Sequence, residues 1–153
     1  MRKLLPLVAA LTATLAFAAA QPYDEAADAK ADLKQALNAS KADQQPVLVI
    51  FGANWCKDCR ALDAALQTGR NAELVKREFR VVKIDVGNFD KNLDVAEAYG
   101  NPIKKGIPAA VVLSPDNKVL YATRLGELAD ARSMSETGIY DFFKKVTETA
   151  RKR

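Results

Sequence analysis

Two cysteines, Cys56 and Cys59, are the only thiols in the 153-residue chain, and they lie three positions apart in the stretch GANWCKDCR. On a helix, residues at this spacing share a face, with their Cβ atoms about 5 to 6 Å apart. Small rotamer adjustments then permit a disulfide between them. The pair therefore predicts reversible dithiol–disulfide exchange, provided that a helix begins at the first cysteine.

The first turn of a helix would make Cys56 the reactive thiol, because unpaired N–H groups and the helix dipole favour an anion there. A contribution of about 1 to 1.5 kcal/mol lowers a thiol pKa from about 8.5 by about one unit, which raises the thiolate fraction at pH 7 from about 3% to about 25%. Of the intervening residues, Lys57 favours the anion and Asp58 opposes it. We expect Cys56 to attack and Cys59 to resolve the mixed disulfide.

Three other roles for the cysteine pair remain open. A structural disulfide is one, although closing so short a loop constrains the unfolded chain much less than closing a long one. A structural zinc ion needs four ligands, whereas the chain has two cysteines and no histidine, so no metal is expected. A copper(I) ion could accept two thiolates, which leaves a copper carrier as an alternative.

The beginning of the chain has the layout of a secretory signal peptide. Two cations precede an apolar run at Leu4–Phe17, and Ala18–Ala20 then supplies a small-residue cleavage site. An uncleaved anchor is the alternative, but the run is short for the roughly 20 apolar residues that a span needs. We expect a signal peptide at 1–20, one domain at 21–153, and a periplasmic or secreted protein without stable membrane insertion after cleavage.

Removal of residues 1–20 leaves 133 residues, of which 21 are basic and 19 acidic. This length suits one compact domain. The nearly balanced charge and the lack of a basic stripe argue against a nucleic-acid partner. The chain has no G-x-G-x-x-G and no phosphate loop, so no bound cofactor is expected. We expect the domain to be a monomer.

The hydrophobic pattern alternates between helix and strand periods, and the order of these elements predicts an α/β fold with one mixed sheet and helices on both faces. The expected strands are 47–51, 79–86, 109–113 and 119–123. The expected helices are 24–38, a segment from the cysteines to Gly69, a short one capped by Asn71, 92–99 up to Gly100, and a last amphipathic one from about 136 to 150 with Ser133 and Glu136 as its capping box.

Several motifs in this order resemble the thioredoxin superfamily from Pro46 to Leu128: the apolar strand, WCKDC, VVKIDV, YGNPIKKGIPAAVVL and ATRLGEL. The break at Gly69 is similar to the branch whose second helix is split. The resemblance implies a thioredoxin-like fold with a four- or five-stranded mixed sheet. It also implies that Cys56 is exposed at the start of the second helix.

The resemblance further implies a cis proline facing the cysteines, and Pro108 in GIPA matches that position. The backbone of Ile107 would then offer an edge to an extended substrate peptide, which pairs as an added strand. Trp55 would form an apolar wall beside the attacking sulfur. We therefore expect Trp55, Ile107 and Pro108 to bind substrate.

Two departures from thioredoxin, and one match, concern the groups that modulate the cysteines. Thioredoxin itself has a buried acid six residues before the first active cysteine, and this chain has Ile50 there. Lys83 matches a lysine that thioredoxin carries on the strand beside the one before the cysteines. The alternative is that Lys83 is an ordinary surface or strand-edge lysine. Asp85 could substitute for the absent acid, because strand alternation places it on the face of Lys83. The second departure is Lys57-Asp58 in place of Gly-Pro.

The expected function is a periplasmic thiol:disulfide oxidoreductase that reduces protein disulfides. A reductase is preferred because no large helical insertion separates Cys59 from the strand at Val81. Its partners would be protein thiols and disulfides, together with a membrane or protein electron donor. The alternatives are a disulfide oxidase or isomerase, a binding module with inert cysteines, and the copper(I) carrier.

Overall fold

The computed structural model describes residues 21–153, so the expected signal peptide at 1–20 lies outside the described residues. The strands are β1 (Val47–Gly52), β2 (Arg80–Asp85), β3 (Ala109–Leu113) and β4 (Val119–Ala122). The helices are α1 (Ala29–Asp43), α2 (Lys57–Leu66), α3 (Gly69–Glu78), α4 (Leu93–Ala98) and α5 (Glu136–Arg151), with the 3₁₀ turns η1 (Pro102–Lys105) and η2 (Ala131–Ser133).

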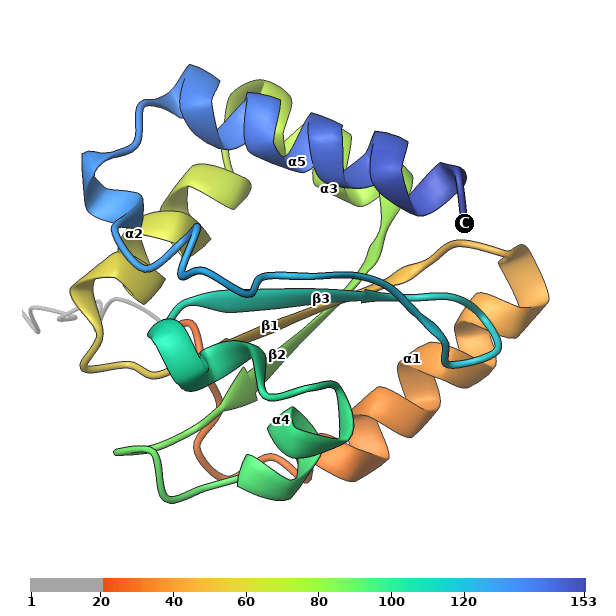
Figure 1. Cartoon of the computed structure of the whole chain (residues 1–153), viewed down its shortest axis with the longest axis horizontal. Helices are drawn as coiled ribbons and strands as arrows, with labels where there is room; N and C mark the ends of the chain where they lie inside the picture. Colours follow the sequence, from red (N-terminus) through yellow and green to blue (C-terminus); the bar gives the residue numbers. More distant parts are fainter. Residues whose placement is uncertain (1–20) are drawn as a thin grey trace, which may run out of the picture.

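The sheet has four strands in the order β2-β1-β3-β4. The β1–β2 pair is parallel, whereas β1–β3 and β3–β4 are antiparallel. Helices α1 and α4 lie on one face of the sheet, and α3 and α5 lie on the other (Figure 1). The predicted mixed sheet between two helical layers is therefore confirmed, with the lower of the two expected strand numbers.

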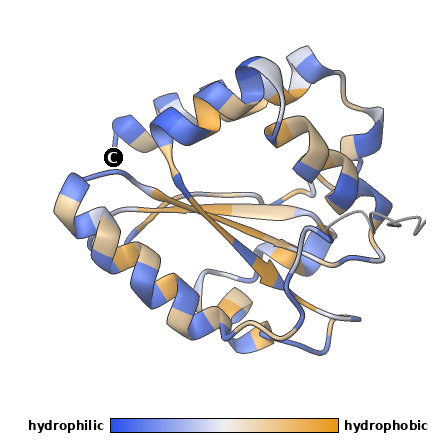
Figure 2. Ribbon diagram, turned by 180° about the vertical axis from the view of Figure 1, so that it is seen from behind, coloured by the Kyte–Doolittle hydropathy of each residue, from blue (hydrophilic) through white to orange (hydrophobic). Residues whose placement is uncertain are grey.

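Strand β1 is buried along its whole length, as its continuous apolar sequence predicts. Because side chains alternate along a strand, Val49 and Phe51 join the core beneath α1 and α4, whereas Leu48 and Ile50 join the core beneath α2, α3 and α5. Figure 2 shows the apolar strands enclosed between helices whose outer faces are hydrophilic. The buried strand β1 therefore gives a fixed support to the cysteine pair, which follows it directly in the sequence.

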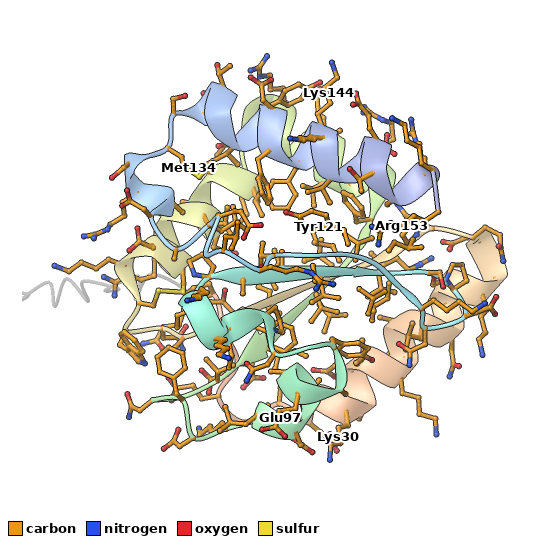
Figure 3. The ribbon with its side chains drawn as sticks, in the orientation of Figure 1. Lys30, Glu97, Tyr121, Met134, Lys144 and Arg153 are labelled. Carbon is orange, nitrogen blue, oxygen red and sulfur yellow. A yellow bond between two sulfur atoms is a disulfide. The ribbon has the colours of Figure 1, made fainter. Side chains whose placement is uncertain are left out.

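The last helix, α5, packs on the sheet through the apolar stripe that the sequence predicts, with Phe143 fully buried. Tyr121 from β4 lies between the sheet and α5 (Figure 3), and its ring meets Phe142 edge-on. The expected Ser133–Glu136 capping box is wrong. Ser135 caps the helix instead, and its Oγ accepts a hydrogen bond from the Gly138 N–H at 3.0 Å.

Two helix starts also differ from the sequence prediction. Helix α1 begins at Ala29 rather than Asp24, because the Asp28 carboxylate accepts the N–H groups of Lys30 and Ala31 and so fixes the start. Helix α3 has Thr68 and not Asn71 as its N-cap residue. Asn71 is buried within the helix, where its Nδ2 donates to the Glu136 carbonyl at 3.3 Å.

Candidate active site

The cysteine pair lies where β1 gives way to α2. Cys56 is the N-cap residue of α2, and its Sγ accepts a hydrogen bond from the Cys59 N–H at 3.1 Å. The two residues form a disulfide, with their Cα atoms 5.2 Å apart. The predicted position of Cys56 at the N-terminus of a helix is confirmed. Its sulfur lies next to the N–H groups of the first helical turn, which favour an anion after reduction.

Cys56 is not exposed, contrary to what the resemblance implies. Only 5% of the residue is accessible, and Cys59 is fully buried. Two neighbours account for this burial: the turn before β3, whose Ile107 carbonyl oxygen lies 3.6 Å from Cys56 Sγ, and Cys59, to which Cys56 is bonded. Cys56 nevertheless remains the more accessible of the two sulfur-bearing residues, in agreement with an attack by Cys56 and a resolving step by Cys59.

The turn that covers Cys56 contains Pro108, the expected cis proline. The Ile107–Pro108 peptide bond is cis, and both residues are buried. They immediately precede β3, so the backbone of Ile107 lies at the margin of the sheet rather than within a strand. The beginning of β3 and the beginning of α2 lie at the same end of the sheet (Figure 1).

Trp55 projects outward beside the cysteine pair and is 54% exposed. Its indole Nε1–H donates to the Gly87 carbonyl at 2.8 Å, and its ring meets Phe89 edge-on at a centroid separation of 6.2 Å. Phe89 is itself 42% exposed. This second aromatic residue could not be predicted from the sequence, because it lies in a turn after β2 that carries no periodic pattern.

The two residues between the cysteines have different environments. Lys57 is exposed, whereas Asp58 binds Arg132, which donates its N–H at 3.0 Å and its Nε–H at 3.1 Å to one carboxylate oxygen. Burial opposes ionisation of Asp58, but the hydrogen bonds and charge of Arg132 outweigh it and lower the pKa of this carboxyl. The opposition of Asp58 to a Cys56 thiolate is thus largely neutralised by a cation that lies 74 residues away in the sequence.

Lys83 and Asp85 lie on the α2 side of β2, because their register partners on β1 are Ile50 and Gly52. Lys83 forms an ion pair with Asp63 of α2, so it is not an unpaired surface lysine. Asp85 is 5% exposed, and its Oδ2 has no hydrogen-bond partner.

The nearest cation to Asp85 is Lys91, whose Nζ lies 3.6 Å from Asp85 Oδ2. Of the two acidic groups, Asp63 borders the same small gap as Ile50, the residue at the position where thioredoxin carries its acid.

The segment before α1 reaches into the site through Tyr23. Asn54 holds its backbone on both sides: the Tyr23 N–H donates to Asn54 Oδ1 at 3.0 Å, and Asn54 Nδ2 donates to the Tyr23 carbonyl at 2.8 Å. The Tyr23 side chain is 3% exposed and packs in the same core as both cysteines. The roles of Tyr23 and Asn54 could not be predicted from the sequence, since a contact between residues 31 positions apart leaves no local pattern.

Two kinds of feature are absent from residues 21–153. No group of three or more histidine, cysteine, aspartate or glutamate side chains is arranged to hold a metal ion. No helix in this range combines the length and the apolar character that crossing a membrane requires.

Comparison with known proteins agrees with this geometry. A family model described as thioredoxin-like matches residues 28–115. Thioredoxin from Buchnera aphidicola subsp. Schizaphis graminum (strain Sg) is 30% identical over 83 residues, which cover 54% of this chain and 68% of that protein.

Among solved structures, a disulphide isomerase from Xylella fastidiosa Temecula1 is 58% identical, with a TM-score of 0.83, over 85% of this chain and 99% of the other. A DsbH oxidoreductase, 21% identical, has the same fold, with a TM-score of 0.59 over 94% of both chains.

Proposed function

Because the chain belongs to the thioredoxin-like family and is a thiol–disulfide oxidoreductase, we propose that it reduces the disulfides of periplasmic proteins through Cys56 and Cys59. The observation that carries this proposal is the position of Cys56 Sγ at the N-terminus of α2, where the Cys59 N–H donates to it. A sulfur in this place is stabilised as the thiolate, which is the nucleophile of disulfide exchange.

In the first step, the Cys56 thiolate of the reduced protein attacks one sulfur of a substrate disulfide. A bond forms between Cys56 and the substrate, and the other substrate sulfur leaves as a thiolate that takes up a proton. The backbone of Ile107 at the margin of the sheet is suited to pair with an extended peptide, and the exposed face of Trp55 lies beside the cysteines.

In the second step, Cys59 Sγ loses its proton and attacks Cys56 Sγ. The disulfide between Cys56 and Cys59 forms, the bond from Cys56 to the substrate breaks, and the second substrate sulfur leaves and is protonated. Two electrons and two protons have then passed from the dithiol to the substrate. A membrane or protein electron donor must return them, since the chain has no motif for a nucleotide cofactor.

The reducing direction is supported by the short path from the cysteines to β2. The chain forms only the rest of α2 and the helix α3 between Cys59 and Arg80. No large helical insertion separates the cysteines from β2, and this is the thioredoxin-like arrangement that favours a reductase over an oxidase. The periplasmic location is supported by the cationic and apolar pattern of residues 1–20.

The test is a pair of single substitutions assayed with a protein disulfide and a chemical reductant. Cys56→Ser removes the nucleophile and is expected to abolish reduction. Cys59→Ser keeps the attack but removes the resolving thiol, and it is expected to accumulate mixed disulfides that reductant releases. Undiminished turnover in either variant contradicts the assigned roles, and the equilibrium reduction potential of the unmodified protein tests the direction.

Isomerisation is a second candidate, because the protein that is 58% identical is described as a disulphide isomerase. A substrate with wrongly paired disulfides separates the two activities. A reductase converts it to free thiols at the expense of the donor, whereas an isomerase restores native pairs without net consumption of reductant.

A further inference from the structure

Two exposed aromatic side chains lie together beside the attacking cysteine. Among residues 21–153, the exposed large hydrophobic residues are Trp55, Val81, Phe89 and Leu125. Trp55 and Phe89 contact each other, with their ring centroids 6.2 Å apart. Because Trp55 immediately precedes Cys56, a substrate that forms a mixed disulfide with Cys56 brings the residues next to its own cysteine close to this aromatic pair.

The turn between β2 and α4 holds Phe89 in an unfavourable backbone conformation. Its φ is 61°, in the left-handed region that bulky side chains rarely adopt. Two hydrogen bonds close the turn, since the N–H groups of Asp90 and Lys91 both donate to the Val86 carbonyl, at 3.2 and 3.3 Å. A third runs from the Asn88 N–H to the Asp90 carboxylate at 2.9 Å. The turn therefore imposes the conformation of Phe89.

The same turn also fixes Trp55. The Gly87 carbonyl accepts the indole Nε1–H at 2.8 Å. A Cβ at Gly87 would lie 2.3 Å from Asp90 Oδ1, and the φ of Gly87 is 55°, so the turn requires glycine at this position. Neither Trp55 nor Phe89 belongs to the two hydrophobic cores of the described domain. The turn thus presents both rings to solvent rather than burying them.

An exposed phenylalanine in a left-handed conformation costs stability without adding to the core. Such conformations cluster at active sites and ligand-binding sites. We propose that Phe89 is a specificity-determining residue which, together with Trp55, selects protein disulfides that carry an apolar side chain next to the attacked cysteine. This side chain packs against the two rings while the cysteine beside it bonds to Cys56. The inference rests on the proposed function and adds the class of disulfide that the protein prefers.

The surroundings of the aromatic pair favour an apolar side chain over a charged one. Apolar and aromatic side chains gain free energy by packing on an aromatic ring. The charged residues of the turn, Asp90 and Lys91, have opposite signs, so the turn has no net charge with which to select a charged side chain. Trp55 already uses its one polar atom, the indole nitrogen, to bond Gly87, which leaves the carbon atoms of its ring for the substrate.

Melting temperatures separate a role of Phe89 in substrate selection from a role in the fold. Asparagine adopts the left-handed region readily, whereas alanine retains its steric cost. In the disulfide form, Phe89→Asn is therefore expected to melt at or above the temperature of the unmodified protein, and Phe89→Ala about 2 to 4 °C below Phe89→Asn. If Phe89→Asn melts below the unmodified protein, the ring serves the fold, and the proposal is overturned.

Two symmetric peptide disulfides test the selectivity directly. Each is a disulfide-linked pair of identical short peptides with one cysteine, which is preceded by leucine in one substrate and by serine in the other. The unmodified protein should reduce the leucine substrate with a kcat/KM about three- to fivefold higher, through a lower KM. In Phe89→Asn this ratio should fall below about twofold. Any change in the reactivity of Cys56 itself cancels in the ratio.

Val81→Thr is the matched control for the peptide assay, because Val81 is 41% exposed, close to the 42% of Phe89, but lies on β2 outside the aromatic pair. It should keep both the rates and the preference for the leucine substrate. A ratio near one in the unmodified protein, or an unchanged ratio in Phe89→Asn, overturns the proposed selectivity. If the unmodified protein reduces neither peptide, the proposed function itself has failed.

Discussion

The hydroxyl oxygen of Tyr23 and the sulfur of Cys59 border the same small space, the one that a side chain at Gly52 would fill. A Cβ at Gly52 would come within 2.2 Å of Tyr23 Oη and 3.0 Å of Cys59 Sγ. The absence of a side chain at the last residue of β1 therefore allows a residue from the N-terminal segment to reach the buried cysteine. The packing of three distant parts of the chain depends on this glycine.

Gly52→Ala is expected to destabilise the oxidised protein by about 1–3 kcal/mol, because an added methyl in a closely packed core forces the Tyr23 ring to move. Urea unfolding of the disulfide form measures this free energy. Gly138→Ala is the control, since Gly138 lies in α5 and its Cβ would meet only the side-chain oxygen of Ser135, at 3.3 Å. The control should be neutral or slightly stabilising, as alanine favours a helix. Equal stability of Gly52→Ala and the unmodified protein would contradict the packing described.

Asn54→Ala is expected to cost about 2–3 kcal/mol of unfolding free energy, because it leaves the N–H and carbonyl of Tyr23 without partners in a buried place. The N-terminal segment should also become more sensitive to limited proteolysis, as it loses its attachment to the site. Tyr99→Phe, which removes an exposed hydrogen bond to Asn117, should change neither measurement appreciably. Full protection of the segment in Asn54→Ala would show that the hydrophobic contacts of Tyr23 hold it alone.

The elements that depend on local pattern could be predicted from the sequence. The apolar run at Val47–Phe51 predicts a central strand because both of its faces are buried, and the stripe of α5 has the period of a helix that packs on a sheet. The position of Cys56 at a helix start followed from the strand before it and the helical period after it. These inferences need only neighbours within a few residues.

The parts that could not be predicted are contacts between residues far apart in the sequence. In the sequence, Asp58 is simply a negative charge next to Cys56 that opposes the thiolate. Only the fold brings Arg132 into contact with it. Strand alternation places Lys83 and Asp85 on one face but does not say which helix covers that face. The helix caps were misassigned for a related reason. Two residues able to cap lie close together at each start, Thr68 and Asn71 at α3 and Ser133 and Ser135 at α5, and only backbone geometry selects one.

Asp58 gives a prediction for the pH dependence of stability. Because Arg132 lowers the pKa of Asp58 in the folded protein, the pair adds stability above the unfolded pKa of about 3.9 and loses it as the pH falls through the lower folded pKa. Asp58→Asn should therefore be less stable at pH 7 by up to about 1 kcal/mol, given that Arg132 is half exposed. This difference should shrink toward zero near pH 2.

Urea unfolding at several pH values between 7 and 2 measures the effect of Asp58→Asn. Asp116→Asn, at an exposed turn position, is the matched control and should follow the unmodified protein throughout. A difference between Asp58→Asn and the unmodified protein that persists unchanged at pH 2 would assign the loss to packing rather than to charge.

The exposed aromatic pair Trp55–Phe89 gives the last prediction, which concerns substrate binding. Phe89→Ala removes the edge-on partner of Trp55 and part of the apolar surface beside the cysteines, so kcat/KM for a peptide disulfide should fall about two- to fivefold through a higher KM. The rate of attack on dithionitrobenzoate should stay the same, because this small reagent needs no peptide contact. Val81→Thr changes a residue of similar exposure on β2 and is the control. Equal losses with the peptide and with the small reagent would mean that Phe89 affects the cysteines rather than the docking of the substrate.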